Sequence, residues 1–291
     1  MDHLAWGVGD HRQQYRNRQI QRMTSLSIFC MGYKKRVWAT LLFLVSWIMG
    51  FGNGVAGQRE GFLLIMDAPT QPASTWAWEL LRNSRRMETV IGVLQASFSL
   101  PRPLTFRFGE GEGPVYDPQR VEITIPYPFI ADIAHLLSEH PAPTAVHSEQ
   151  TDTLDVVEWV VYHELAHAFV DLFNLPVLGR EEDAADALAT LLAIELVEDG
   201  GRMALTAADL LARVAANAKN TPNASFWNEH TVDQQRFSQV VCWVYGSDTT
   251  TFAPLANSGT IPHQRAQRCP DAFSTMAQGW WRLLDRYIKP A

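Results

Sequence analysis

The sequence predicts an α+β fold that is rich in helix, with a small sheet and one long helix buried at its centre. Three observations predict it: short alternating runs in the first half, longer helical segments in the second half, and a stretch over residues 154–173 that is apolar on nearly every side. With 291 residues, of which 47% are hydrophobic and 19% charged, the chain can bury a full core. We expect that core in one domain over residues 58–291.

The predicted sheet comes from the first half of this domain. Residues 61–66 form a short apolar run typical of a buried strand, and residues 104–108 and 121–127 alternate between polar and apolar side chains. Pro126 and Pro128 cannot donate to a neighbouring strand. We therefore expect the strand over 121–127 at the edge of the sheet.

One helix and two turns separate these strands. Residues 74–98 predict a single helix capped by Ser74 or Thr75. The glycine-rich run 109–113 predicts a solvated turn, because no Lys-Ser/Thr pair follows it as in a phosphate-binding loop. Residues 116–118 predict a second turn.

The rest of the domain predicts helices only. They span residues 129–138, 154–173, 180–198, 206–217, 232–245 and 270–287.

Residues 1–57 predict an N-terminal extension and a signal peptide. A basic cluster at 34–36 precedes an apolar run at 37–51, and small residues follow, which is the order of a secretory signal cut near Ala56 or Gly57. Met31 stands just before the basic cluster, so we expect translation to start there. The apolar run is shorter than the roughly 20 residues of a membrane span. We expect an exported protein, periplasmic or secreted; the alternative is a single uncleaved N-terminal anchor in the membrane.

The charge of the chain argues against a nucleic acid partner. The formal net charge is −7, and the first 57 residues hold seven basic and two acidic side chains, so the remaining body carries −12. A body of this charge repels phosphate backbones.

Two of the three cysteines belong to the predicted mature chain. Cys30 precedes the apolar run and would be removed with the signal, which leaves Cys242 and Cys269. In an oxidising compartment this pair favours a disulfide, which would stabilise the fold by about 3–4 kcal/mol. The alternatives are two separate buried thiols or a cysteine pair in a metal site.

The motif that carries chemistry is His163-Glu164-Leu165-Ala166-His167. Positions i and i+4 of a helix lie one turn apart on one face, so both imidazoles can bind one Zn²⁺. Glu164 directly follows the first histidine, which places its carboxylate beside a zinc-bound water as the general base of a hydrolysis. The competing interpretation is a pair of core histidines with an ion-paired glutamate, although such groups are costly in an apolar helix unless they are paired or bind a metal.

A catalytic zinc needs a third protein ligand and an open fourth position. If the next helix returns antiparallel after residue 173, its first turn comes back toward His167. That turn offers three acids, Glu181, Glu182 and Asp183. Asp186 lies one turn beyond Glu182, where it can accept a hydrogen bond from a ligand histidine. Asp171, one turn after His167, is a further alternative ligand.

The motif HELAH followed by Glu182-Asp-Ala-Ala-Asp186 resembles the gluzincin pattern HExxH plus ExxAD. That resemblance implies a zincin-like fold, with Glu182 as third ligand and Asp186 as the group that orients a histidine. Residues 60–290 also resemble a family of bacterial proteins named putative metallopeptidases, whose substrate is undefined, through HELAHAFVD, GREEDAADALAT, DQQRF and CWVYGSD. This second resemblance implies peptidase activity on a peptide or protein substrate, and the histidine motif implies one catalytic zinc.

Zincins commonly align their substrate along an edge strand beside the active helix, and by that analogy the strand over 121–126 is our candidate. Three residues are candidates for an additional donor to the oxyanion, namely His230, Arg236 and Tyr245, although each of these residue types is more often structural than catalytic. The leading hypothesis is thus an exported zinc metallopeptidase. One alternative is a non-catalytic envelope protein that uses a zincin scaffold for binding, and another is a zinc amidase acting on cell-wall peptide. The presence of Glu164 favours an enzyme, because a structural metal site needs no base there.

Overall fold

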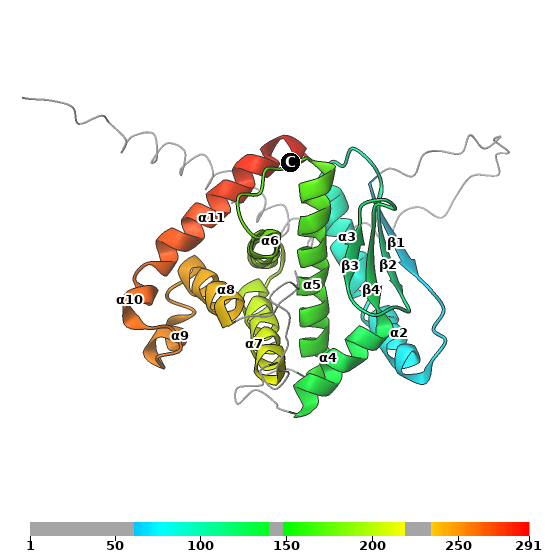
Figure 1. Cartoon of the computed structure of the whole chain (residues 1–291), viewed down its shortest axis with the longest axis horizontal. Helices are drawn as coiled ribbons and strands as arrows, with labels where there is room; N and C mark the ends of the chain where they lie inside the picture. Colours follow the sequence, from blue (N-terminus) through cyan, green and yellow to red (C-terminus); the bar gives the residue numbers. More distant parts are fainter. Residues whose placement is uncertain (1–60, 140–147, 219–233, 291) are drawn as a thin grey trace, which may run out of the picture. The chain divides into compact units, whose positions relative to one another are not determined.

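The computed structural model describes residues 61–139, 148–218 and 234–290, and Figure 1 shows how their elements are arranged. The expected signal peptide over 1–57, the start at Met31 and His230 lie outside these residues. The described part combines many helices with one four-stranded sheet, which confirms the helix-rich α+β prediction. Within this part, no helix has the length and apolar character that a bilayer crossing needs.

The sheet has the order β1-β2-β4-β3. Its strands are β1 (Phe62–Met66), β2 (Leu104–Gly109), β3 (Val115–Asp117) and β4 (Glu122–Pro126). β1, β2 and β4 run parallel, while β3 runs antiparallel to β4. Alternate side chains of β2 and β4, such as Phe106 and Ile123, are completely buried. This alternation places one face of the sheet on the core.

The prediction that the strand over 121–127 lies at the edge is wrong. β4 pairs with β2 on one side and with β3 on the other. Pro126 is tolerated because it is the last residue of the strand. Pro128 falls in the first turn of α4 (Tyr127–Glu139), where N–H groups have no partner within the helix. The edge strand on this side is β3, whose residues were partly predicted as a turn.

The helix predicted over 74–98 is two helices. α2 (Pro72–Ser84) ends at Arg85, and α3 (Arg86–Ser97) begins directly after it. Arg85 has a φ of 52°, so the chain passes through a left-handed conformation there and changes direction. No glycine marks this break, which is why the apolar spacing suggested a continuous helix.

The cap of α2 also differs from the prediction. Its N-cap is Gln71, and neither Ser74 nor Thr75 occupies that position. The hydroxyl of Ser74 instead donates to Glu110 Oε2 at 2.9 Å, and the amide of Thr70 donates to Glu110 Oε1 at 3.0 Å. These bonds attach the turn after β2 to the start of α2.

The remaining helices follow the sheet in the chain. They are α5 (Glu149–Leu172), α6 (Glu181–Leu196), α7 (Gly200–Ala218), α8 (Gln234–Ser247), α9 (Ala253–Asn257), α10 (His263–Ala266) and α11 (Cys269–Leu284), with a short 3-10 turn, η1 (Asp285–Tyr287). The short helices α9 and α10 lie where no helix was predicted. The other helices appear where expected, with shifted ends.

α5 occupies the centre of this arrangement. It packs against β3, β4 and α4 on one side and against α6 and α7 on the other (Figure 1). Nearly every side chain from residue 153 to 169 is buried, as the apolar pattern over 154–173 predicts. The histidine motif therefore lies in the buried middle part of this helix.

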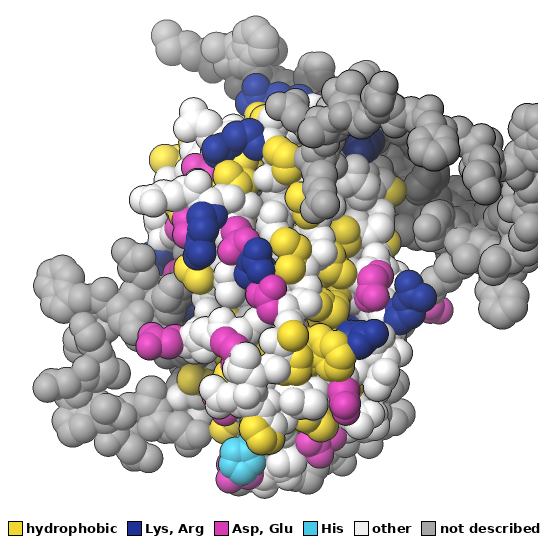
Figure 2. Space-filling model, turned by 90° about the vertical axis from the view of Figure 1, so that its right-hand side faces the viewer, with side chains coloured by type: hydrophobic (Ala, Val, Ile, Leu, Met, Phe, Trp, Pro, Cys, Tyr) yellow, Lys and Arg dark blue, Asp and Glu magenta, His cyan; other side chains and the backbone are white. Residues whose placement is uncertain are grey.

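Two further features concern the rest of the body. Cys242 of α8 and Cys269 of α11 form the expected disulfide. On the face shown in Figure 2, acidic and basic side chains lie next to one another among hydrophobic ones, so neither sign of charge dominates that face.

Candidate metal centre

The site forms where α6 crosses α5. In Figure 1, α6 is seen nearly along its axis while α5 is seen from the side, so the two helices cross steeply and do not run antiparallel as expected. The connection between them turns at Asn174 and Gly179, whose φ angles are 48° and 139°. The crossing places residues one turn apart on α6 against the same residue of α5.

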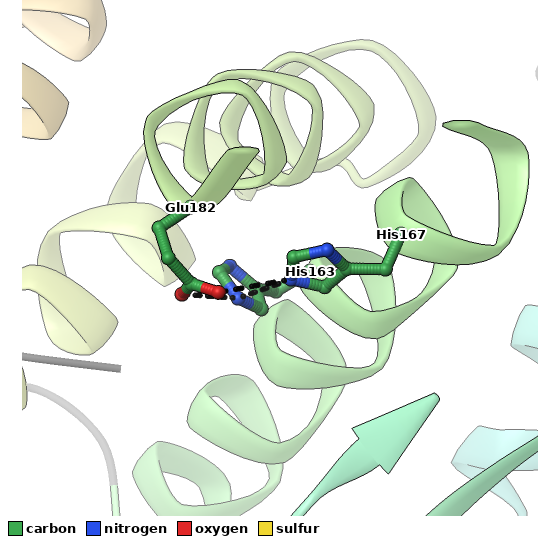
Figure 3. Close-up of side chains that lie close together, drawn as sticks. All are labelled: His163, His167 and Glu182. Carbon is green, nitrogen blue, oxygen red and sulfur yellow. Dashed lines mark hydrogen bonds and ion pairs between the residues drawn. The ribbon is translucent and has the colours of Figure 1, made fainter. Parts of the chain in front are cut away.

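Three side chains converge at this crossing (Figure 3). His163 Nε2 lies 3.3 Å from Glu182 Oε2, and His167 Nε2 lies 3.4 Å from Glu182 Oε1. The two Nε2 atoms are 3.3 Å apart. One ligand atom from each residue lies within 4.8 Å of the other two, so the three residues could hold one metal ion.

The second nitrogen of each histidine faces a different carboxylate. His163 Nδ1 lies 2.9 Å from Asp186 Oδ1, and His167 Nδ1 lies 2.7 Å from Glu181 Oε1. A carboxylate at Nδ1 keeps the proton on that nitrogen and leaves the lone pair on Nε2. Two Nε2 lone pairs and a carboxylate then point at a common space, which is a donor set that a cation fits.

The charge of the site also favours a bound cation. Glu164, Glu182 and Asp186 are buried, with exposed fractions of 4%, 7% and 2%, and the one buried cation among them is Arg236 at 6%. With neutral histidines the formal charge of these four groups is −2. Buried charge is costly unless it is compensated, and one divalent cation compensates this charge.

Without a metal ion, a proton on His163 compensates part of this negative charge. Burial lowers the pKa of His163, but the hydrogen bonds to Asp186 and Glu182 outweigh it and raise the pKa to about 9. Burial raises the pKa of Glu182, and its bonds to His163 and His167 bring that pKa well below the usual range. In the absence of a metal ion, a proton on His163 thus balances part of the negative charge of Glu182 and Asp186.

Glu164 lies close to His163 and His167 but is not part of the group of three residues that could hold a metal ion. It is buried on α5 and close enough to raise the pKa of both His163 and His167 by its charge. A metal ion held by these three residues in a tetrahedral site would have a fourth position for water or substrate, and Glu164 would lie near that ion.

Arg236 pairs with two carboxylates of α6. Its Nε and Nη2 donate to Asp186 Oδ2 and Oδ1 at 2.6 and 2.7 Å, and its Nη1 lies 3.7 Å from Glu182 Oε2. Arg236 is buried and paired with these two carboxylates, which favours the structural alternative over an oxyanion donor for this residue. Tyr245 is the other described candidate for this donor. It lies nine residues after Arg236 on α8, which corresponds to about 13.5 Å along the helix axis from Arg236.

The competing ligands do not join the group. The carboxylate of Asp171 accepts from the Tyr116 hydroxyl at 2.6 Å and faces Arg102 at 3.8 Å. Glu181 faces the outer nitrogen of His167, and Asp183 lines a groove between α6 and α11. Of the three acids in the first turn of α6, only Glu182 reaches both histidines.

Sequence reasoning missed two contacts of the histidines. Trp159 stacks on the His163 ring, with centroids 5.7 Å apart, and its position one turn before His163 could have shown this. Glu181 supports His167 as Asp186 supports His163, although it was considered only as a ligand.

The comparison with known families agrees with this geometry. The sequence profile of a family described as "Putative metallopeptidase" matches residues 67–284, which is most of the chain. The chain belongs to this metallopeptidase family. The matched range contains α5, α6 and α8, and so every described residue of the candidate centre. Searches of curated proteins and of solved structures found no match.

Proposed function

We propose that this member of the metallopeptidase family is an exported, zinc-dependent peptidase with a zincin-like fold. The observation that carries the proposal is the convergence of His163 Nε2, His167 Nε2 and Glu182, with Glu164 buried directly beside them. Two imidazoles and one carboxylate, with an open fourth position, are a ligand set typical of catalytic zinc. The predicted ligands His163, His167 and Glu182 and the orienting Asp186 all belong to this arrangement.

The residues of the chain would divide the reaction as follows. A zinc ion at the three ligands would polarise the scissile carbonyl and make a water molecule more acidic. Glu164 takes the proton from that water as it attacks, and then donates a proton to the leaving amine. Asp186 and Glu181 hold the two imidazoles in the tautomer that the reaction needs.

The strand that binds the substrate must be a different one from the strand over 121–126. β4 has no free edge, so the strand over 121–126 cannot pair with a peptide. β3 contacts α5 and pairs only with β4 among the described strands. We propose that an extended peptide binds along β3 by backbone hydrogen bonds.

Export remains part of the proposal. The buried disulfide between Cys242 and Cys269 supports an oxidising compartment such as the periplasm or the extracellular space. The expected N-terminal signal peptide, cut near Ala56 or Gly57, would deliver the protein there.

The test compares zinc content and turnover in the full chain, produced with its N-terminal segment, and in two variants. Glu164→Gln should bind one zinc per chain but cleave a mixed-peptide library about 10²–10⁴-fold more slowly than the wild type. Glu149→Gln, an exposed glutamate at the start of the same helix, should match the wild type.

Each other outcome excludes part of the proposal. Zinc without turnover on peptides would favour a binding protein, and turnover on cell-wall peptide alone would favour an amidase. A wild-type chain that binds no zinc would remove the metal centre itself.

A further inference from the structure

Arg236 connects a third helix to the metal centre. It lies near the start of α8, 50 residues after Asp186 in the chain, and outside the two motifs on α5 and α6. Its side chain is 6% exposed, and three of its nitrogens face carboxylates of α6. Among the described residues, this guanidinium reaches the site through those carboxylates.

The first of the two carboxylates is Asp186. Arg236 binds both of its oxygens, and Asp186 Oδ1 also faces His163 Nδ1 at 2.9 Å. A two-point contact fixes the plane of a carboxylate as well as its position. The orientation of Asp186, and through it the rotation of the His163 ring, therefore depends on Arg236.

The second carboxylate is Glu182. Arg236 Nη1 lies 3.7 Å from Glu182 Oε2, the oxygen that faces His163 Nε2 at 3.3 Å. Glu182 and Asp186 are one turn apart on the same face of α6, so one planar guanidinium spans both. Arg236 thus contacts both Glu182, which is a proposed metal ligand, and Asp186, which faces the proposed ligand His163.

We propose that Arg236 is a positioning residue, which sets the geometry of the metal ligands through Asp186 and Glu182. This inference rests on the proposed function, because it assumes that the three converging side chains bind a divalent metal ion. Arg236 does not touch the substrate or the metal in this role. Its contribution is to hold the ligand set in the arrangement that binds zinc before the ion arrives.

Charge and geometry make opposite predictions here. A cation so close to a ligand oxygen repels Zn²⁺, so if charge alone mattered, its removal would tighten zinc binding. If positioning dominates, removal weakens zinc binding, since groups that orient metal ligands are worth about 10–100-fold in affinity. Whether removal of Arg236 raises or lowers the zinc Kd therefore decides between positioning and charge repulsion.

The experiment measures the zinc Kd of the full chain by competition with a chromophoric chelator. Arg236→Met should raise the Kd about 10–100-fold. Arg236→Lys keeps the charge but cannot reproduce the two-point contact, so it should also raise the Kd. If the methionine variant does not fold, the lysine variant carries the test.

Arg86→Met is the matched control. Arg86 also bridges two buried carboxylates of one helix, binding Glu158 through Nε and Asp155 through Nη2, both at 2.5 Å, but these carboxylates do not contact the ligands. Its removal should lower thermal stability and leave the zinc Kd unchanged. The Co²⁺ absorption spectrum should change in the Arg236 variants and not in Arg86→Met.

Three results would contradict the inference or separate it from the proposed function. An unchanged or lower Kd in both Arg236 variants overturns the positioning role and leaves the peptidase proposal intact. A wild-type chain without zinc overturns both. If the wild type binds zinc but cleaves nothing, the peptidase proposal fails, while the Kd comparison still decides the role of Arg236.

Discussion

Both ring nitrogens of His163 face carboxylates, with Nδ1 2.9 Å from Asp186 and Nε2 3.3 Å from Glu182. Such a residue must carry either a proton or a metal ion at Nε2, because an unprotonated nitrogen would face an anion there. The proton and the metal therefore compete for the same lone pair. This competition connects the pH response of the protein to its metal content.

The first prediction concerns the identity of the third ligand. Glu182→Gln should weaken zinc binding by more than about 100-fold, beyond the range of a merely orienting group, because it removes the charged ligand that faces both histidines. Glu181→Gln should weaken binding by no more than about 10-fold, since its amide oxygen can still accept from His167 Nδ1. The zinc Kd of each variant measures this. Equal losses in the two variants would mean that both acids bind the metal.

The second prediction concerns the metal-free protein. His163 has a pKa of about 9 when folded and about 6.5 when unfolded, so the folded state binds its proton more tightly. The resulting stability is fully present below about pH 6.5 and is lost as the pH rises through about 9, with a size on the order of 3 kcal/mol. Urea unfolding in the presence of a chelator should show this decline.

The control for this pH dependence is His163→Gln, which cannot titrate at that position. Its unfolding free energy should change less between pH 6.5 and 9 than that of the wild type. A wild type whose metal-free stability stays constant over that range would show that the His163 proton is not held by Asp186 and Glu182.

For individual residues, the sequence was most informative where the chemistry depends on local spacing along a helix. His163 and His167 come together because they are four residues apart on one helix, and Glu182 and Asp186 share a face of α6 for the same reason. Arg236 was considered as an oxyanion donor or a structural residue, and its contacts with α6 could not be predicted, since its partners lie 50 or more residues away and no local pattern indicates them.

Among the elements, the long helices were predictable and the short or strained ones were not. α5 and α6 were expected because their apolar content persists over several turns. β3 has only three residues, too few for an alternating pattern, and the break at Arg85 lacks the glycine that usually marks one. The inner position of β4 could not be read from its prolines, because both of them fall where a missing N–H costs nothing.

The crossing of α5 and α6 had a larger consequence for the site. An antiparallel return would have placed the first turn of α6 beside His167 alone. The steep crossing instead lets Glu182 and Asp186 both reach His163, while Glu181 reaches the outer nitrogen of His167. Sequence patterns predict the length and face of a helix, but its crossing angle depends on side-chain packing between the elements.

Across the whole molecule, α8 connects the centre to the C-terminal part of the chain. Arg236 lies near its start and Cys242 lies six residues later, joined to Cys269 at the beginning of α11. The disulfide therefore restrains the helix that carries Arg236. Its contribution to stability and its contribution to the site can be measured separately.

The third prediction is that loss of this disulfide destabilises the protein and leaves zinc binding largely intact. The two cysteines are 27 residues apart, and closing a loop of that size stabilises the folded state by about 3–4 kcal/mol in the chain-entropy model. The double variant Cys242→Ala, Cys269→Ala should lose that amount in urea unfolding. Its zinc Kd should stay near the wild-type value, because Arg236 is held to α6 by its own contacts.

Wild type reduced with a phosphine, which avoids the zinc binding of thiol reductants, separates the cross-link from side-chain packing. Both sulfurs are fully buried, so the alanine variant also loses packing that the reduced protein keeps. Reduced wild type should therefore be less stable than the oxidised protein but more stable than the variant. If reduction costs less than about 1 kcal/mol, the loop is already restrained by other contacts in the unfolded chain, and the entropic account of this disulfide fails.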